Sequence, residues 1–267
     1  MNQSFKERQL NRQFERIPQG VTKHILKEYE KIKNLPLLRY QELTPYFESE
    51  KELFAMCQDF FNYFPFLKEK QEKIKTFEKR TSFIKQQDGS KYRGLTKRDL
   101  FGKPYFKLYY NCSLEDLMFL NHEYAHGFYE KRFYTYREQS FISELEGYFF
   151  EYLTFVFLKE KKILTLEDDT KIENNNAWNI KEMFTKFIHG YNYINGIDHT
   201  LSNQYYLTVK KVNLKEEATY LYSYIIHSYL ERMAKSDLEK SFYYFECLKR
   251  EKDRNEAKLI LKNLKHY

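Results

Sequence analysis

Residues that interrupt secondary structure are scarce in this sequence. Its 267 residues include 8 Gly and 5 Pro, against 25 Tyr and 24 Phe. Glycine and proline often end helices and strands, so a chain poor in both can form long uninterrupted segments. Long side chains lose little freedom in a helix, and the many aromatic rings can fill the gaps between packed helices. The sequence therefore predicts a mostly α protein.

The overall composition is that of a soluble globular protein. Hydrophobic residues make up 42% of the chain and charged residues 31%, and the formal net charge is +7. The sequence has no tight block of Lys and Arg with interleaved aromatic residues, which argues against nucleic-acid binding. The longest apolar run, at residues 153–158, is far too short to cross a bilayer. We expect neither a nucleic-acid partner nor a membrane span.

The N-terminus and the cysteines indicate the compartment. The first residues, MNQSFKERQLNRQF, are polar and charged, unlike a secretory signal. The three cysteines, Cys57, Cys112 and Cys247, are odd in number and far apart, so they form no disulfide framework. We therefore expect a cytoplasmic protein.

One segment reads as a β-strand. Residues 103–111, KPYFKLYYN, follow loop markers at 88–90 and Gly94 and are rich in aromatic and apolar residues. Pro104 lies near the start of the segment and cannot donate a hydrogen bond to a neighbouring strand. Its presence predicts a strand at the edge of a sheet. We expect no other strand.

Periodic apolar residues predict helices on both sides of this strand. Residues 1–80 read as several helices. Ser113 and the acidic residues after it can cap a helix that runs to about Tyr129. The other predicted segments are a helix over 138–158, a helix over 178–187, loops within 175–200, and helical sequence from Glu216 nearly to the end, with a break before a capping box at 236–239.

The predicted helix over 113–129 contains the pattern HExxH. Residues four apart lie one turn above each other, so His122 and His126 can bind the same metal ion. Glu123 lies beside them, where it can take a proton from a metal-activated water. Zinc lowers the pKa of such a water and polarises a substrate carbonyl, which makes hydrolysis possible near neutral pH. The ligand types indicate zinc, although another divalent ion could bind the same donors.

Chance offers an alternative explanation of this pattern. With seven histidines, a chain of this kind contains HExxH by accident in about one case in a hundred. Two histidines on an amphipathic helix could also be ordinary half-buried residues. A zinc site needs a third protein ligand and an open fourth position for water.

The second predicted helix offers a candidate for the third ligand. Glu144 follows His126 by 18 residues, enough for a turn between two antiparallel helices. Glu151 lies two helical turns beyond Glu144 and could hydrogen-bond a ligand histidine, which would fix the tautomer of that histidine. Glu146 points elsewhere on the helix and is the weaker candidate for a ligand. All three could also be solvated charges.

Together these segments resemble the thimet oligopeptidase and oligoendopeptidase F family of zinc peptidases. Residues 103–127 are similar to the family stretch that joins a substrate-edge strand to the zinc helix. Residues 141–144, with Glu151 seven residues on, are similar to the helix that supplies the third zinc ligand. Residues 219–224, TYLYSY, resemble a helix that contributes a catalytic tyrosine, and residues 257–262 resemble the closing helices.

The resemblance implies a fold and a site. The fold would be a helical, thermolysin-like zincin catalytic domain with a small edge-strand element over 81–267, preceded by a helical segment over 1–80. It would hold one zinc ion, and the substrate would be a peptide. The implied site residues are the zinc ligands His122, His126 and Glu144, the second-shell Glu151, the base Glu123, Tyr222 to stabilise the tetrahedral intermediate, and Tyr105, Lys107 and Tyr109 to pair with the substrate backbone.

The chain also departs from the family pattern. Ala125 stands where the family usually has Gly, and the segment between His126 and Glu144 is several residues shorter than usual. The whole chain is less than half the usual family length. A family histidine upstream of the tyrosine helix has no clear counterpart, and His199 is the nearest in order.

Three functions remain open at this point. The first is a zinc-dependent endopeptidase that hydrolyses short peptides by Glu-assisted attack of water. The second is a catalytically degenerate, peptidase-like module that binds peptides or a protein partner without cleavage. The third is a basic helical protein that binds nucleic acid and carries HExxH by chance. Intact HExxH together with Glu144 favours the first, because peptide binding alone does not require that set.

Overall fold

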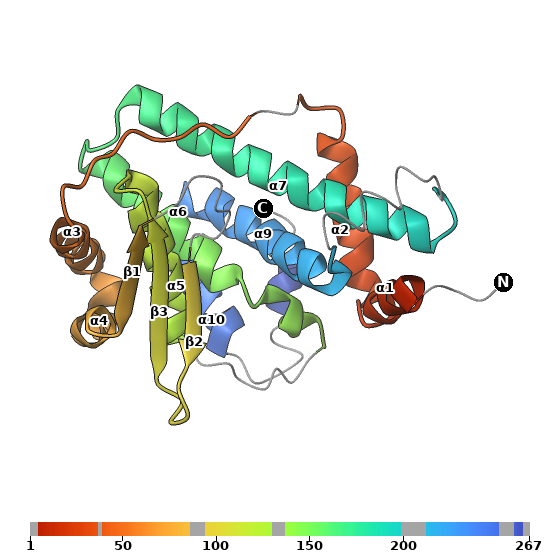
Figure 1. Ribbon diagram of the computed structural model, residues 1–267, viewed down its shortest axis with the longest axis horizontal. Helices are drawn as coiled ribbons and strands as arrows, with labels where there is room; N and C mark the ends of the chain where they lie inside the picture. Colours follow the sequence, from red (N-terminus) through yellow and green to blue (C-terminus); the bar gives the residue numbers. More distant parts are fainter. Residues whose placement is uncertain are drawn as a thin grey trace.

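The computed structural model describes residues 5–36, 39–85, 94–129, 137–198, 212–250 and 259–263, and the described residues form a mostly helical protein with one small sheet (Figure 1). The mostly α prediction is confirmed. The elements in chain order are α1 (Phe5–Glu15), α2 (Gln19–Ile32), α3 (Glu50–Tyr63), the 3-10 helix η1 (Pro65–Lys70), α4 (Gln71–Glu78), β1 (Thr81–Lys85), β2 (Gly94–Arg98), β3 (Pro104–Tyr110), α5 (Leu114–Phe128), the 3-10 helix η2 (Arg137–Ile142), α6 (Leu145–Glu160), α7 (Leu166–Ile194), α9 (Leu214–Ala234) and α10 (Leu238–Arg250).

The sheet has three strands in the order β1-β3-β2. β3 pairs in parallel with β1, where Phe106 lies opposite Thr81, and antiparallel with β2, where Leu108 lies opposite Gly94. The prediction that residues 103–111 form an edge strand, and the only strand, is therefore wrong. Pro104 is the first residue of β3, a position at which proline is tolerated even in a central strand.

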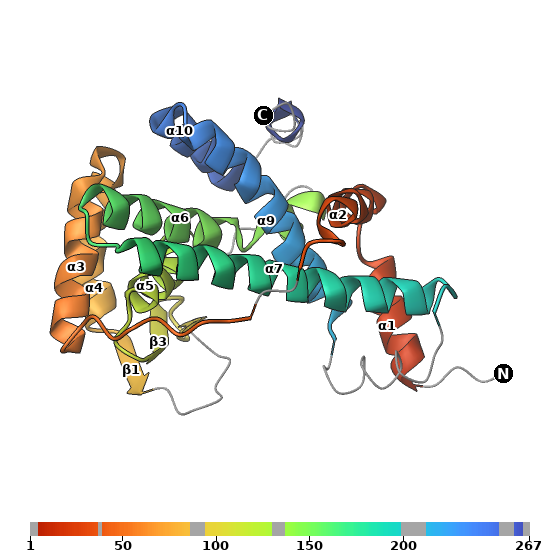
Figure 2. The ribbon, with the colours of Figure 1, turned by 90° about the horizontal axis from the view of Figure 1, so that it is seen from above.

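Helix α5 lies between the sheet and helix α6, and α9 packs across α6 and α7 (Figure 2). The start of α5 agrees with the prediction, because the Asp116 carboxylate accepts hydrogen bonds from the backbone N–H groups of Asn111 and Ser113. The buried Asn121 side chain ties α5 to its neighbours. It donates to the Thr154 hydroxyl of α6 and accepts from the Cys57 thiol of α3.

The predicted helix over 138–158 is interrupted. The structure has η2, then a break at Ser143 and Glu144, then α6. The Ser223 hydroxyl of α9 stabilises the break, because it accepts from the Glu144 backbone N–H at 3.2 Å and donates to the Phe141 carbonyl at 3.1 Å. These are two groups that an unbroken helix would have used internally. Glu144 consequently lies at the start of α6 rather than within it.

Helix α7 is longer than predicted. It spans 29 residues, including most of the region 175–200 that we expected to contain loops. A capping box between Thr165 and Asp168 starts it, and the buried Asn175 side chain is satisfied by the backbone of Gln41 and the Glu115 carboxylate. Asn175 therefore does not end this helix, because its polar side chain has hydrogen-bond partners outside the helix.

The C-terminal helical prediction is confirmed for the described residues, with a small shift at the break. Asp237 rather than Ser236 caps α10, because its carboxylate accepts from the Lys240 N–H at 2.9 Å. The Ser236 hydroxyl instead donates to the Met233 carbonyl.

A single large cluster of buried side chains holds these elements together. It contains Val21 and Phe60 from the first 80 residues as well as Phe149 and Leu221 from the remainder. The division of the chain into segments 1–80 and 81–267 stays a prediction. Among the described residues, no helix combines the length and apolar character needed to span a membrane.

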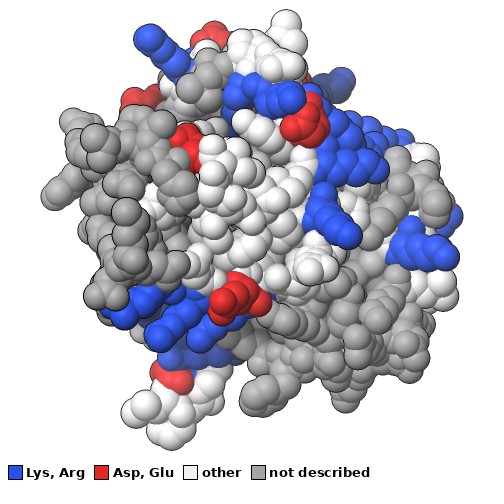
Figure 3. All heavy atoms as spheres, turned by 90° about the vertical axis from the view of Figure 1, so that its right-hand side faces the viewer, with Lys and Arg blue, Asp and Glu red and all other residues white. Residues whose placement is uncertain are grey.

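The basic character of the chain is visible on its surface. On the face drawn in Figure 3, Lys and Arg side chains flank a largely uncharged central area, and few acidic side chains appear. This agrees with a formal net charge of +7.

Candidate metal centre

Three side chains from two segments converge on one point. His122 and His126 are one turn apart on α5, and their Nε2 atoms are 3.1 Å apart. The Glu144 Oε2 lies 3.6 Å from the His122 Nε2 and 3.4 Å from the His126 Nε2. Donor atoms about 2.1 Å from a tetrahedral zinc ion are separated by roughly 3.4 Å, so these distances fit a His2Glu site with an open fourth position.

The other nitrogen of each imidazole faces a second carboxylate. The His122 Nδ1 lies 2.6 Å from the Glu151 Oε1, and the His126 Nδ1 lies 3.1 Å from the Glu146 Oε1. The opposite oxygen of Glu146 is held by the buried Lys249 ammonium of α10. A carboxylate on Nδ1 fixes the tautomer that leaves Nε2 free to bind metal.

The sequence did not predict the hydrogen bond between Glu146 and His126, nor the involvement of Lys249. Glu146 does point away from Glu151 on the helix, as predicted. The two histidines lie one turn apart on α5, however, so each meets a different carboxylate of α6. The available signal in the sequence was the position of Glu146 between Leu145 and Gly147.

Carboxylates surround both imidazoles and favour positive charge at this point. Burial alone would lower the pKa of His126, but Glu144 and Glu146 outweigh it and raise the pKa to about 9. Burial likewise opposes the effect of Glu151 and Glu144 on His122, whose pKa is nevertheless raised well above its ordinary value. Burial would raise the pKa of Glu144, but the two imidazoles lower it. An environment that attracts protons to two imidazoles also favours a divalent cation.

Two glycines allow the close approaches on which the site depends. A Cβ on Gly147 of α6 would lie 2.2 Å from the His122 ring, and a Cβ on Gly94 of β2 would lie 2.5 Å from the Glu123 Oε1. Any residue larger than glycine at position 147 would displace the His122 ring, and one at position 94 would displace the Glu123 carboxylate.

Glu123 lies beside β2, not beside β3. The Thr96 hydroxyl of β2 is 2.6 Å from the Glu123 Oε2 and 2.9 Å from the Glu123 carbonyl, and it can donate to either. The Glu123 side chain is thereby held next to the pair of histidines. The residue is largely buried, with 9% of its surface exposed. Within the described sheet, β2 is the outer strand on this side.

The structure contradicts the prediction for the substrate strand. Tyr105 pairs with Lys97 of β2, Tyr109 pairs with Ile84 of β1, and Lys107 has a partner on each side. Each of the three residues already has a partner within the sheet, and β3 is the central strand, so its backbone does not form the open sheet edge that we predicted for an added peptide. β3 packs against the HExxH helix through the Phe106 ring, which contacts Tyr124, whereas the Glu123 carboxylate lies against β2.

The tyrosine prediction also needs correction. Tyr222 is 1% exposed, and its ring faces His24 of α2 at 6.0 Å. Tyr220 and Tyr224 line the cavity beside the metal centre instead. A helix turns by about 100° per residue, so Tyr222 lies on nearly the opposite side of α9 from both of them.

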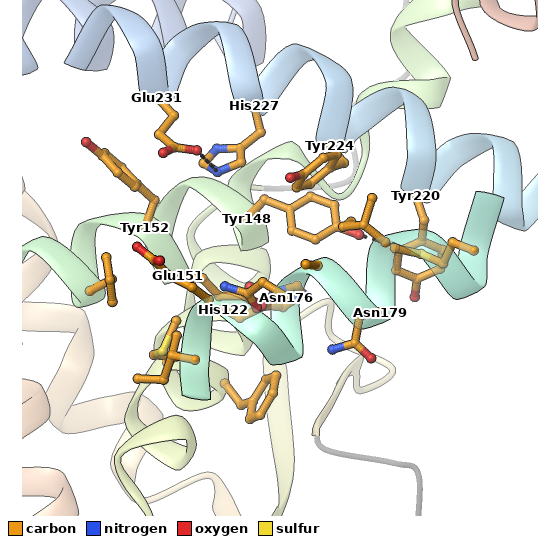
Figure 4. Close-up of a pocket in the computed structure, with 18 of the residues that line it drawn as sticks. His122, Tyr148, Glu151, Tyr152, Asn176, Asn179, Tyr220, Tyr224, His227 and Glu231 are labelled. Atoms are coloured by element: carbon orange, nitrogen blue, oxygen red, sulfur yellow. Dashed lines mark hydrogen bonds and ion pairs between the residues drawn. The ribbon is translucent and has the colours of Figure 1, made fainter. Parts of the chain in front are cut away.

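The cavity beside the metal centre has a volume of about 590 Å³. His122 and Glu123 form part of its wall, α7 contributes Asn176 and Asn179, and α9 contributes residues including His227 (Figure 4). His227 is buried and contributes to the cavity wall. His199, the nearest in order to the family histidine, lies outside the described residues.

Comparisons with known proteins support the fold. No family model matches the sequence, and no curated protein matches it. Among solved structures, the chain is similar to a crystal structure described as a "putative oligoendopeptidase F from Bacillus anthracis str. Ames", with a TM-score of 0.54 and 11% sequence identity. The similarity covers 99% of this chain and 56% of that protein, so this chain spans little more than half the length of the protein it resembles.

Proposed function

We propose that this chain is a zinc-dependent endopeptidase of the thimet oligopeptidase and oligoendopeptidase F type, which hydrolyses short peptides. The observation that carries the proposal is the convergence of His122, His126 and Glu144, whose donor atoms all lie within 4.8 Å of one another, with Glu123 beside them. Neither a structural core nor a peptide-binding surface requires that arrangement. The similarity to a protein described as an oligoendopeptidase points to the same class.

The three donors would hold one zinc ion, which, when bound, polarises the substrate carbonyl and lowers the pKa of water. The chain's own residues supply the proton transfers. Glu123 takes a proton from the attacking water and later delivers it to the leaving amine. The hydrogen bond from Thr96 orients the Glu123 carboxylate for both steps.

A tyrosine hydroxyl would stabilise the negative charge that develops on the substrate oxygen. Tyr220 and Tyr224 are the candidates on the cavity wall. Burial raises the pKa of Tyr224 and that of Tyr220, so both hydroxyls stay protonated and able to donate near neutral pH.

The outer edge of β2 is the best place for the substrate backbone. It is the sheet edge nearest the HExxH helix, and Gly94 at its start lines the cavity. An extended peptide that adds to this edge would be held by main-chain hydrogen bonds, which require little of its sequence.

Cleavage of a quenched fluorescent peptide library by the purified protein tests the proposal. We expect cleavage that a chelator abolishes and zinc restores, and close to one zinc per chain by metal analysis. The His122→Ala variant should contain no zinc and cleave nothing. If the protein contains stoichiometric zinc and binds peptides but does not cleave them, the proposed enzymatic function is contradicted. That result would indicate a non-catalytic peptide-binding module. Absence of zinc together with absence of cleavage would contradict the proposed peptidase.

A further inference from the structure

The cavity beside the metal centre is strongly acidic, although the chain as a whole is basic. Its lining includes five carboxylates and a single ammonium group, that of Lys186. Glu123 and Glu151 belong to the proposed catalytic machinery. The other three, Glu173 and Glu182 of α7 and Glu231 of α9, have no part in it.

This negative charge is not neutralised within the cavity. Lys186 lies 3.7 Å from Glu182 and 3.8 Å from Glu217, so its charge is shared between two carboxylates. Outside the lining, the exposed Lys235 ammonium lies 3.2 Å from the Glu231 Oε1, while the Glu231 Oε2 faces His227. A divalent ion would offset two of the five charges, and Lys186 and Lys235 one each, which still leaves the cavity negative. Glu173 forms no ion pair with any of the described residues.

Aromatic rings gather at one end of the cavity, which we call the tyrosine pocket and define by Tyr148, Tyr152, Tyr224, His227 and Glu231 (Figure 4). The three tyrosine rings surround the imidazole, at centroid distances of 6.1 Å, 5.9 Å and 6.2 Å in that order. Carboxylates combined with aromatic faces are the groups that proteins use to bind organic cations.

His227 gives an independent sign that this pocket takes a ligand. The residue is 6% exposed and lines the cavity, and its Nδ1 has no hydrogen-bond partner among the described residues. Its Nε2 lies 4.0 Å from the Glu231 carboxylate, beyond a normal hydrogen bond. Burial lowers the pKa of His227, so the ring is neutral near pH 7 and carries a lone pair that can accept a hydrogen bond. Buried polar groups without partners are costly, and a bound donor would remove that cost.

We propose that the tyrosine pocket binds an arginine side chain of the substrate peptide. This assignment rests on the proposed peptidase function and names the class of peptide that the site selects. A guanidinium group can stack on tyrosine rings and donate to a carboxylate in a planar, forked geometry, which a lysine ammonium cannot match. Glu231 supplies the carboxylate and His227 a second acceptor.

Binding and cleavage can be measured separately. The inactive Glu123→Gln protein with zinc bound would be titrated with fluorescent peptides that carry arginine, or its neutral analogue citrulline, at successive positions. At one of these positions we expect arginine to bind about tenfold tighter, which corresponds to about 1.4 kcal/mol. Glu231→Gln should remove most of this preference, and His227→Phe, which keeps a ring, should reduce it. Glu239→Gln, an exposed carboxylate of α10 outside the cavity, is the matched control and should leave it unchanged.

The catalytically competent protein is then tested for cleavage of the same peptides. Faster cleavage of the arginine peptide, lost in Glu231→Gln, supports the pocket. Equal cleavage of arginine and citrulline peptides would overturn the pocket while leaving the peptidase intact. Arginine-selective binding without any cleavage would overturn the peptidase and support the pocket as a binding site. If the protein shows no preference for arginine in binding and cleaves none of the peptides, both the proposed pocket and the proposed peptidase function are overturned.

Discussion

At the scale of single residues, the metal centre is defined by what contacts the two imidazoles. Each ring has a carboxylate on its Nδ1 side, while Glu144 lies near both Nε2 atoms. The rings are therefore held in one orientation with their free lone pairs directed at a common point. Second carboxylates of this kind commonly change metal affinity by about 10- to 100-fold.

Replacing Glu123 by Gln tests the proposed base. The amide keeps the shape of the side chain but cannot take a proton from water, so we expect kcat to fall by about 10²- to 10⁴-fold. Zinc content should not change, because Glu123 is not a ligand. The measurements are peptide hydrolysis and metal analysis of the same preparation. Activity within tenfold of the original protein would remove Glu123 from the mechanism.

Glu217 gives the protein a pH-dependent stability. Burial raises its pKa from 4.5 to about 7 in the folded chain, although Lys186 opposes the shift. A group whose folded pKa is raised adds stability below its unfolded pKa, and this contribution is lost as pH rises through the folded value. The neutral Glu217→Gln variant should therefore have a higher Tm than the original protein at pH 8 and little advantage at pH 5.

Thermal unfolding followed by circular dichroism at both pH values measures this difference. The adjacent, exposed Glu216 provides the control, since Glu216→Gln removes the same charge without relieving burial. A Glu217→Gln advantage of equal size at pH 5 and pH 8 would contradict the assignment.

At the scale of elements, the site depends on how closely α6 packs against α5. Gly147 lets the α6 backbone approach the His122 ring. The Ser223 hydroxyl holds open the break between η2 and α6, which lets Glu144 leave the helix start towards the histidines. The third ligand is thus positioned by a helix, α9, that supplies no ligand itself.

Gly147→Ala should lower zinc affinity strongly and abolish activity. The added methyl group would lie 2.2 Å from the His122 Cε1, so either the ring or the helix must move. Alanine would otherwise stabilise the helix by about 1 kcal/mol relative to glycine. Any loss of zinc affinity must therefore come from this collision. Zinc affinity by competition with a chelating dye measures the effect.

Gly190→Ala is a matched control for this prediction. Its added methyl group would also come within 2.2 Å of a side-chain carbon, that of Leu214, but away from the metal centre. We expect a lower Tm with unchanged zinc affinity. Normal zinc binding by Gly147→Ala would show that the site tolerates a wider separation of α5 and α6.

At the scale of the whole molecule, one buried cluster joins the N-terminal helices, the sheet and the C-terminal helices. The metal centre links α5 to the η2–α6 junction, and the cavity beside it is bounded by α5, α6, α7, α9 and β2. A charge distribution that is basic overall and acidic in this cavity would concentrate cationic peptides at the site.

Removal of the metal should lower the stability of the whole chain. A ligand that binds only the folded state stabilises it by about 4 kcal/mol when its concentration is about 1,000 times Kd. For a chain of this size, that corresponds to a Tm shift of roughly 10 °C. Differential scanning fluorimetry with zinc and with a chelator measures the shift, and the His122→Ala variant should show none. An identical response from that variant would place the stabilising ion elsewhere.

The local features of this protein follow from its sequence alone. Few breakers and an apolar repeat near 3.6 residues are enough to form long helices, and the i,i+4 spacing places His122 and His126 on one face of α5 wherever that helix lies. The start of α5 was equally local, since the Asp116 carboxylate reaches back only three residues to Ser113. Glu144 was also identified from local sequence, because its distance from His126 along the chain allows one turn between two antiparallel helices.

Which residues from distant segments meet depends on how the helices and strands pack in three dimensions. Strand order depends on pairing across the chain, so the sequence did not reveal that β3 is central and that β2 lies next to Glu123. The choice between Tyr222 and its neighbours depends on how α9 is rotated against α2 and α7, which its many aromatic residues left ambiguous. The pairing of Glu146 with His126 likewise required the register between α5 and α6. Local hydrogen bonding fixes a helix, but contacts between elements depend on packing that no single segment encodes.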